Sequence, residues 1–369
     1  MPTNSWDGTL ARDPPFATDV VGAGGNVKLG ITEGLRRARR VWWRRQPGIV
    51  ILMYHRVADV ECDPYGLAVP PGAFREQVEA LARSERVLPL PRAREAIESG
   101  RLPGRAFVVT FDDGYRDNLT VALPELERAG VPATVFVTTA AVDAREEFWW
   151  DLLERAVLGP REVPEKLEIE TPNGLKSFDF SACRIWTEAA RAERVCRSAW
   201  EAPPGSRMRT YHELCRVIQP LEPALQHRIA RAACEWAGVT TDPRPTSATM
   251  TRDEVAALSR SPLVEIGGHT ATHLQMSAHD AERQRRDVVE NRAFLQEIVG
   301  KAVVSFAYPY GAFGADSAAV VRDAGFAQAC TTVDRSARAG ADAFLLPRFH
   351  VPAFGGERFE RWLADCFGR

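Results

Sequence analysis

The chain contains no pair of cysteines spaced as CxxC, and its seven cysteines are spread widely along 369 residues. An odd count without close pairs argues against a disulfide framework, and the missing CxxC spacing argues against a structural zinc ribbon. We therefore expect reduced thiols that are buried in the protein. The length suits one large domain with an insertion, or two modest domains.

Long apolar runs and an excess of charge of one sign are also missing. No segment approaches the roughly 18–20 apolar residues that a membrane-spanning helix needs. Residues 1–30 contain no apolar run of signal-peptide length. The formal net charge is −2, so no broad electrostatic field favours nucleic acid as a partner. These absences predict a cytoplasmic protein that does not bind nucleic acid.

Residues 1–46 lack the pattern of a packed domain. Residues 1–30 are short of apolar periodicity and contain many small residues, which is typical of a loosely ordered tail. Residues 35–45 are basic and contain Trp42 and Trp43. Such a stretch either lies on an anionic membrane surface or packs its tryptophans on the body of the protein. The sequence leaves both interpretations open, as it does the oligomeric state.

From residue 47 onward, apolar runs alternate with segments of helical spacing. Five runs have the pattern of strands buried on both faces, namely residues 49–54, 106–111, 132–137, 263–266 and 303–308. This alternation predicts an α/β fold with a parallel sheet, and the number of repeats favours a barrel. The rhythm is broken at about residues 145–248. We expect a helical insertion there, inside one domain that covers residues 47–369.

Polar residues directly follow several of these strands. The functional groups of a parallel α/β barrel lie at the carboxyl ends of its strands. The residues found at such positions are His55, Asp112, Asp113, His269, His273 and the segment Tyr308-Pro309-Tyr310-Gly311. We therefore expect these side chains to converge at one end of the barrel.

The segment His269-Thr270-Ala271-Thr272-His273 places two imidazoles four residues apart. On one turn of helix the two rings share a face and can bind one metal ion. The glutamate that follows the first histidine in zinc metalloproteases is replaced by Thr270, so that base is missing. This spacing is weak evidence alone, but Gly267 and Gly268 just before it allow a sharp turn out of a buried strand.

The segment Thr110-Phe111-Asp112-Asp113-Gly114 places two adjacent carboxylates at the end of a buried strand. Buried carboxylates are unfavourable unless they are paired or bind a metal. Asp113-Gly114 also fits an ordinary turn, but a turn does not account for the second acid. Adjacent carboxylates suit a division of roles in which one binds a metal ion and the other acts as a base.

Together and in this order, the two motifs resemble those of the polysaccharide deacetylase family, the NodB-homology group of carbohydrate esterases. The resemblance covers roughly residues 49–142 and 250–351. It implies a distorted (β/α)7-type barrel. It also implies a hydrolase that removes an acyl group, above all acetyl, from an amino-sugar nitrogen.

The resemblance also assigns roles to individual residues. Asp113, His269 and His273 are expected to bind one divalent metal ion, and Asp112 is expected to be the general base. The backbone N–H of Tyr310 is expected to stabilise negative charge on the carbonyl oxygen. Two histidines and one aspartate suit zinc, and cobalt, nickel, iron and manganese also fit.

Two positions depart from the pattern of the family. Ala307 stands where an arginine usually precedes the segment Tyr308-Pro309-Tyr310, and the late Leu-x-His element is poorly matched at residues 346–351. The opening strand instead resembles that of the circularly permuted poly-N-acetylglucosamine deacetylases, in which an early histidine is the general acid. We therefore expect His55, rather than His350, to protonate the leaving amine.

Other residues are candidates for contact with the substrate. Tyr308, Pro309 and Arg348 are assigned to substrate binding, and Arg348 is also the candidate to replace the missing arginine beside the base. Trp149 and Trp150, at the start of the insertion, either stack on sugars or anchor the insertion by hydrophobic packing.

The expected substrate is an amino sugar within a glycan, a glycolipid or a sugar-conjugate precursor, and the sequence leaves the carrier open. The same site suits an esterase that removes O-acetyl groups. A catalytically silent carbohydrate-binding protein on the same scaffold is a third interpretation, and the four intact residues of the two motifs argue against it.

Overall fold

The computed structural model describes residues 47–84, 86–144, 146–187 and 198–369. Residues 1–46 lie outside the described residues, and with them the basic segment 35–45, for which membrane contact is one interpretation. Within the described part of the chain, every helix is too short or too polar to cross a membrane.

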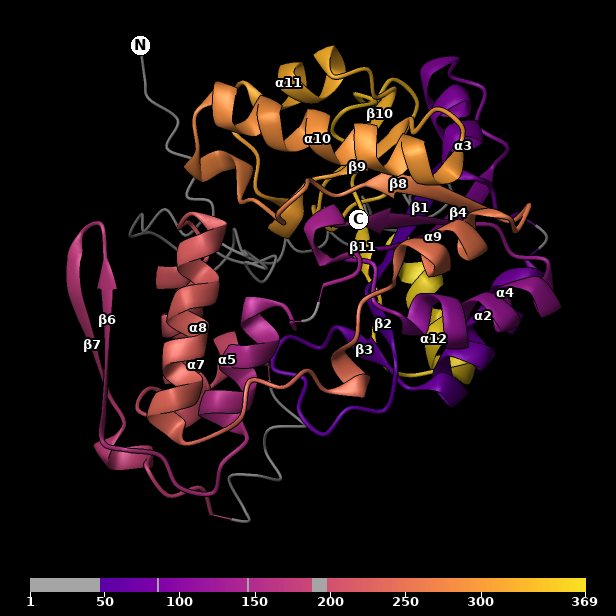
Figure 1. The fold of residues 1–369 in the computed structure, drawn as a ribbon. Coiled ribbons are helices and arrows are strands. Elements are labelled where there is room, and N and C mark those ends of the chain that lie inside the picture. The colour runs from indigo at the N-terminus through magenta and orange to yellow at the C-terminus, as the bar shows by residue number, and fades with distance from the viewer. Residues whose placement is uncertain (1–46, 85, 145, 188–197) are drawn as a thin grey trace, which may run out of the picture.

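A seven-stranded parallel sheet forms the centre of the fold (Figure 1). In spatial order its strands are β10 (Gln328–Cys330), β9 (Ser305–Ala307), β8 (Val264–Gly268), β5 (Ala133–Val137), β4 (Arg105–Phe111), β1 (Gly48–Tyr54) and β11 (Phe349–His350). Every pairing between neighbours is parallel. All seven residues of β1 are buried, as expected for a strand covered on both faces. The predicted α/β fold is confirmed.

One segment near the C-terminus joins the two edges of this sheet. Leu346 forms a parallel bridge with Cys330 of β10. Three residues later, Phe349 pairs with Leu52 of β1. The sheet therefore curls round on itself, which confirms the predicted distorted (β/α)7-type barrel. Arg348 lies within this closing segment, between its two pairings.

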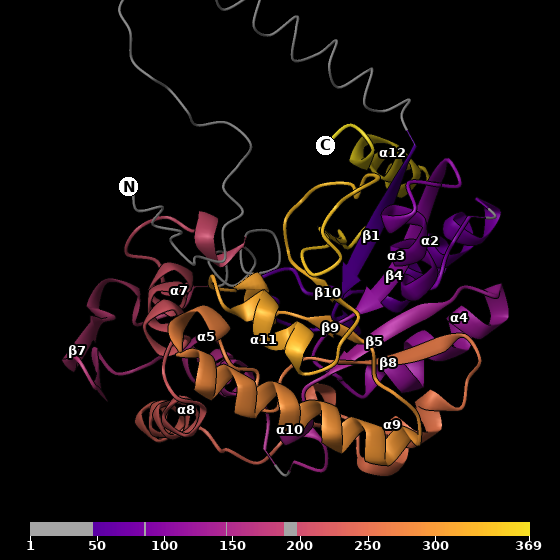
Figure 2. The same ribbon diagram turned by 90° about the horizontal axis from the view of Figure 1, so that it is seen from above.

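Helices cover the outside of the curled sheet (Figure 2). They are α2 (Pro71–Arg83), α3 (Leu90–Glu98), α4 (Leu123–Ala129), α9 (Arg252–Ser259), α10 (Ala281–Val299), α11 (Ser317–Asp323) and α12 (Gly356–Cys366). The helix α10 begins where Asp280 accepts a hydrogen bond from the N–H of Arg283, and it ends at Gly300 in the left-handed conformation. A small parallel pair, β2 (Arg56–Val57) and β3 (Ala68–Val69), follows β1.

The insertion has a hydrophobic core of its own and lies to one side of the barrel (Figure 1). Its helices are α5 (Trp149–Leu158), α7 (Arg207–Ile218) and α8 (Pro223–Ala237), and α5 packs against the other two. Tyr65 and Tyr310 of the barrel pack against this core. The insertion therefore reaches the barrel near the carboxyl ends of the strands.

The insertion also contains an antiparallel hairpin that the prediction of a helical insertion missed. It consists of β6 (Lys166–Thr171) and β7 (Gly174–Asp179). Leu167 and Ile169 of β6 are buried while their neighbours are exposed, which is the alternation of a half-buried strand. This pattern spans only six residues. It is too short to stand out between helical segments.

Candidate metal centre and its chamber

Asp113 and two histidines converge beyond the carboxyl ends of β4 and β8. Nε2 of His273 lies 3.1 Å from Oδ1 of Asp113, and Nε2 of His269 lies 3.4 Å from the same oxygen. One ligand atom from each residue lies within 4.8 Å of the other two, and all three residues are buried. Two imidazole nitrogens and one carboxylate oxygen fit a single divalent cation and leave coordination positions open. The three predicted ligands are thus brought together.

The predicted turn of helix across His269 and His273 is wrong. Both residues lie in a loop after β8, in which Thr270 has φ 59° and His273 has φ 57°. Asn291 of α10 holds this loop because its Nδ2 donates to the carbonyl of Thr270 at 2.7 Å. A Cβ atom at Gly268 would lie 2.5 Å from Oδ1 of Asn291, so this glycine permits the close approach. Left-handed turns, rather than helical spacing, bring the imidazoles together.

The two histidines are oriented in different ways. Nδ1 of His269 lies 2.8 Å from the carbonyl oxygen of Ala307 and donates to it, so Nε2 keeps its lone pair for a cation. Nδ1 of His273 has no hydrogen-bond partner among the described residues. Its ring instead packs against Tyr310, with centroids 4.4 Å apart, and against Trp150, with centroids 4.6 Å apart.

Asp112 is held by a fully buried arginine. Two guanidinium nitrogens of Arg348 donate to the two carboxylate oxygens of Asp112, each at 2.7 Å, and Nε of Arg348 donates to the carbonyl of Thr331 at 2.9 Å. Burial raises the pKa of Asp112, but the charge and hydrogen bonds of Arg348, together with the nearby histidines, outweigh this effect, and the pKa lies below its usual value. Asp112 is therefore an oriented carboxylate that is ionised at neutral pH.

Both candidates for the general acid line a cavity above the ligand triad. We call this cavity the chamber; Asp112, Trp150 and Tyr310 also line it. Nε2 of His55 lies 4.0 Å from Oδ2 of Asp112, and the rings of His55 and His350 are 6.1 Å apart between centroids. Both histidines line the chamber above the ligand triad, as does Tyr310. The choice of His55 over His350 therefore stays a prediction.

The residues assigned to substrate binding lie away from the chamber. Tyr308 is fully buried, and its hydroxyl donates to the carbonyl of Phe344 at 3.1 Å. Pro309 is buried, Arg348 lies beneath Asp112, and none of these three assigned side chains lines the chamber. The geometry does not favour direct contact between them and the substrate. It places Arg348 in the other predicted position, beside Asp112.

The two tryptophans at the start of the insertion have different surroundings. Trp149 belongs to the hydrophobic core of the insertion and reaches the chamber at its edge, where its Nε1 donates to the hydroxyl of Tyr310 at 3.3 Å. Trp150 faces the chamber beside His273 and donates from its Nε1 to the hydroxyl of Tyr115 at 2.9 Å. The sequence analysis did not identify Tyr115, although it directly follows the acid pair and its glycine.

The geometry can now be compared with known proteins. A family model for polysaccharide deacetylase matches residues 99–164 and 224–329. The poly-beta-1,6-N-acetyl-D-glucosamine N-deacetylase of Escherichia coli K12 is 33% identical over 115 residues, which cover 29% of this chain and 17% of that protein. The resemblance to the polysaccharide deacetylase family is confirmed. The alignment thus spans about a sixth of the length of this curated relative.

Solved structures of other proteins share the fold of this chain. IcaB from Ammonifex degensii has a TM-score of 0.53 and 19% identity, covering 88% of this chain and 98% of the other. The Streptococcus pyogenes deacetylase PplD, in complex with acetate, has a TM-score of 0.50 and 16% identity, covering 84% and 94%. At such identities the likeness concerns the fold alone.

The family match covers only part of the site. It includes the acid pair and the two histidines, whereas His55 and Arg348 lie outside it. It also extends to residue 164 and resumes at residue 224, so it reaches further into the insertion than the expected limits of 142 and 250. The helices α5 and α8 are therefore largely covered by the family pattern, while the hairpin and α7 are not.

Proposed function

We propose that the chain is a metal-dependent carbohydrate N-deacetylase, which hydrolyses an N-acyl group, above all N-acetyl, on an amino sugar. One observation carries this proposal. The three ligands Asp113, His269 and His273 face the same chamber as a carboxylate, Asp112, that a buried arginine holds in place. This arrangement provides a metal site and a separate base at one end of the barrel.

The ligand set fits a borderline cation such as zinc, and cobalt, nickel, iron and manganese suit the same donors. When bound by Asp113, His269 and His273, the cation supplies a Lewis acid that polarises a carbonyl group and acidifies water. The hydrogen bond from His269 to Ala307 presets this ligand before the cation binds.

The residues of the chain move the protons of the reaction. Asp112 accepts a proton from the attacking water, whose oxygen forms the new bond to the acyl carbon. The backbone N–H of Tyr310 stabilises the negative charge that develops on the carbonyl oxygen. The bond between carbon and nitrogen then breaks as His55 donates a proton to the leaving nitrogen. The products are a carboxylic acid and a free amino sugar.

The test is acetate release from N-acetylglucosamine oligomers by purified protein, after chelation and after reloading with each of the five metals. We expect release by the reloaded protein only. The variant Asp112→Asn is expected to keep its metal and to lose about 10²–10⁴-fold in turnover, the typical contribution of a general base. Asp253→Asn, in an exposed first turn of α9, is the matched control.

Three outcomes would change the proposal. Full activity of the chelated protein would rule out metal dependence. Faster release from O-acetyl than from N-acetyl sugars would make the protein an esterase. Sugar binding without any release would make it a silent binding protein.

A further inference from the structure

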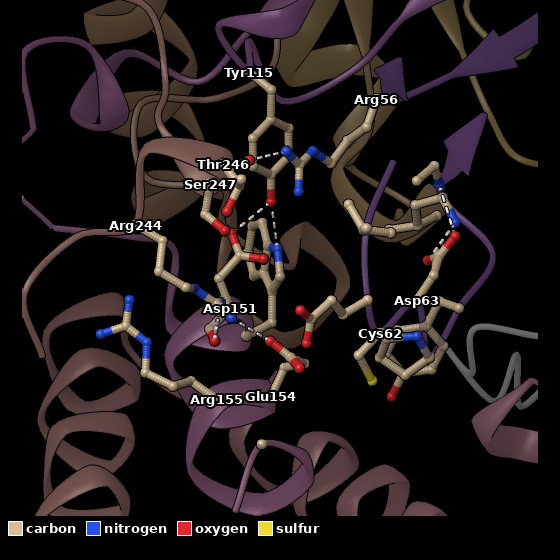
Figure 3. Close-up of a pocket in the computed structure, with 18 of the residues that line it drawn as sticks. Arg56, Cys62, Asp63, Tyr115, Asp151, Glu154, Arg155, Arg244, Thr246 and Ser247 are labelled. Atoms are coloured by element: carbon tan, nitrogen blue, oxygen red, sulfur yellow. Dashed lines mark hydrogen bonds and ion pairs between the residues drawn. The ribbon is translucent and has the colours of Figure 1, made fainter. Parts of the chain in front are cut away.

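A second and larger cavity adjoins the chamber (Figure 3). We call it the insertion cavity. On one side it is lined by residues that follow β1 and by Tyr115. On the other side it is lined by the helix α5 of the insertion. Its volume is about 480 Å³, whereas that of the chamber is about 150 Å³, and Tyr65, Leu67 and Trp150 line both. Small-molecule sites usually have about 300–1,000 Å³. The chamber alone is below this range, so a saccharide longer than one unit has to extend beyond it.

The arginines that line the insertion cavity are all neutralised by carboxylates. The ion pairs join Arg56 to Asp117 at 3.1 Å, Arg155 to Glu147, and Arg244 to Glu147 at 2.9 Å and to Glu154 at 2.8 Å. Three positive charges are thus matched by three negative charges. These arginines are already paired and leave no excess positive charge for a phosphate.

Two other carboxylates in the lining, those of Asp63 and Asp151, form no such ion pair within the described part of the chain. Among the described residues, no arginine, lysine or histidine nitrogen lies within ion-pair distance of Asp151 or Asp63. Oδ2 of Asp151 accepts a hydrogen bond from the hydroxyl of Tyr115 at 2.8 Å. Burial raises the pKa of Asp151 to about 7. Arg56 and Arg244 lower this pKa from a distance, but their direct ion pairs are with other carboxylates, so the carboxylate of Asp151 can accept a charged donor from a ligand.

The wall shared by the two cavities suits a sugar ring. Trp150 lines both, and its Nε1 is held by the hydroxyl of Tyr115, the same hydroxyl that bonds Asp151. The indole of Trp150 is stacked on Phe148, with centroids 4.3 Å apart, so the ring has a fixed orientation and only its remaining surface is available to a sugar. The carboxylate of Asp151 belongs to the residue next to this ring. An amino group on a sugar beside Trp150 would therefore meet a negative charge.

We propose that the insertion cavity binds a sugar unit with a free amine, next to the unit whose acyl group lies at the metal centre. This inference rests on the proposed function and names its substrate class, a glycan chain that already carries deacetylated amino sugars. The surplus of carboxylates repels phosphate, so nucleotide-linked and pyrophosphate-linked sugars are not expected to occupy the cavity.

The experiment compares three probes by acetate release: N-acetylglucosamine, its fully acetylated tetramer, and the same tetramer with one glucosamine unit. We expect kcat/KM to be about tenfold higher for the amine-bearing tetramer than for the acetylated one, because one charge-assisted hydrogen bond contributes about this factor in affinity. This preference should decrease at high salt. In Asp151→Asn this preference should fall to about one, because the charge that recognises the amine is lost.

Two further variants separate recognition from structure. Asp253→Asn removes an exposed carboxylate elsewhere and is expected to keep the tenfold preference. Asp151→Glu keeps a carboxylate at this position, so it should keep most of the preference. A preference as low in Asp151→Glu as in Asp151→Asn would show that the charge is not the recognition group and would overturn the proposal.

Other outcomes also decide against it. Equal rates of the wild type on the two tetramers, or a higher kcat/KM for uridine-diphosphate N-acetylglucosamine, would overturn the proposal. If no probe releases acetate, the proposed function fails separately. Calorimetric binding of the amine-bearing tetramer to the chelated protein then tests the cavity alone, and unchanged affinity in Asp151→Asn would refute it.

Discussion

His269 and His273 belong to the same ligand triad, but different parts of the molecule hold them. His269 donates from Nδ1 to the carbonyl of Ala307, at the end of a barrel strand. His273 has no such bond from Nδ1 among the described residues, and its ring packs between Tyr310 of the barrel and Trp150 of the insertion. The barrel fixes its ligand by a directional bond, whereas the insertion contributes only aromatic packing.

The same contrast holds for the rest of the site. On the barrel side, Arg348 binds both oxygens of Asp112 in a fully buried ion pair. On the insertion side, Trp150 acts through the position of its ring. Directional bonds to buried charges tolerate little change, while packing contacts adjust. Changes on the barrel side should therefore abolish activity, and changes on the insertion side should tune it.

The largest effect is expected for Asp113→Asn, which removes the carboxylate ligand from the centre of the triad. Metal affinity should fall more than about 100-fold, beyond the usual effect of losing a residue that only supports a ligand. Acetate release should fall to the level of the chelated protein. Metal analysis and calorimetric titration check this, with Asp112→Asn as a variant that keeps the ligands. Retention of stoichiometric metal by Asp113→Asn would contradict the assignment.

A large loss of stability is expected for Arg348→Met. It leaves the buried charge of Asp112 without its partner, which typically lowers the free energy of unfolding by about 3–5 kcal/mol. Urea unfolding measures this loss. The double variant Asp112→Asn/Arg348→Met should regain part of it, because the unpaired charge is then absent. A single variant as stable as the wild type would show that the buried ion pair does not stabilise the fold.

A moderate effect is expected for Trp150→Ala, on the insertion side. The ring of His273 then loses a packing partner, and metal affinity should fall about tenfold, the lower end of the effect of supporting residues. Trp236→Ala is the matched control because this tryptophan packs in the insertion without lining the chamber. Equal metal affinities of the two variants would show that packing of Trp150 on His273 does not support this ligand.

The smallest effect concerns the pH dependence of stability. Burial raises the pKa of Asp151 from 3.8 to about 7, so the folded protein holds this proton more tightly than the unfolded chain. The wild type should therefore lose stability relative to Asp151→Asn as the pH rises through this window. Because Asp151 is only half-buried, we expect the total change in the free energy of unfolding to be about 1 kcal/mol. Urea unfolding below and above this window measures it, and a constant difference would contradict the shift.

The barrel and its acid pair could be predicted because the relevant signals are local. The strand before Asp112 and Asp113 is a continuous apolar run, and polar residues after such a run lie at the carboxyl edge of a parallel sheet. The position of Asp113 therefore follows from a few neighbouring residues. The same argument placed His55 at the chamber.

Other parts of the site depend on contacts that no local pattern reveals. The helix expected at His269 and His273 does not form, because Asn291 from a distant helix fixes a left-handed loop. The packing of Trp150 on His273 depends on how the insertion docks, which periodicity does not show. Arg348 could be suggested as the partner of Asp112 only because the family pattern lacked an arginine elsewhere.

The closing segment of the barrel has a consequence for synthesis of the protein. Asp112 and Arg348 are 236 residues apart in the chain. At about 5–20 residues per second, the ribosome needs roughly 10–50 s to reach Arg348 after Asp112 has been made. During that interval the base has no counter-ion, and burying it is unfavourable. We therefore expect the nascent barrel to stay open until Arg348 has emerged.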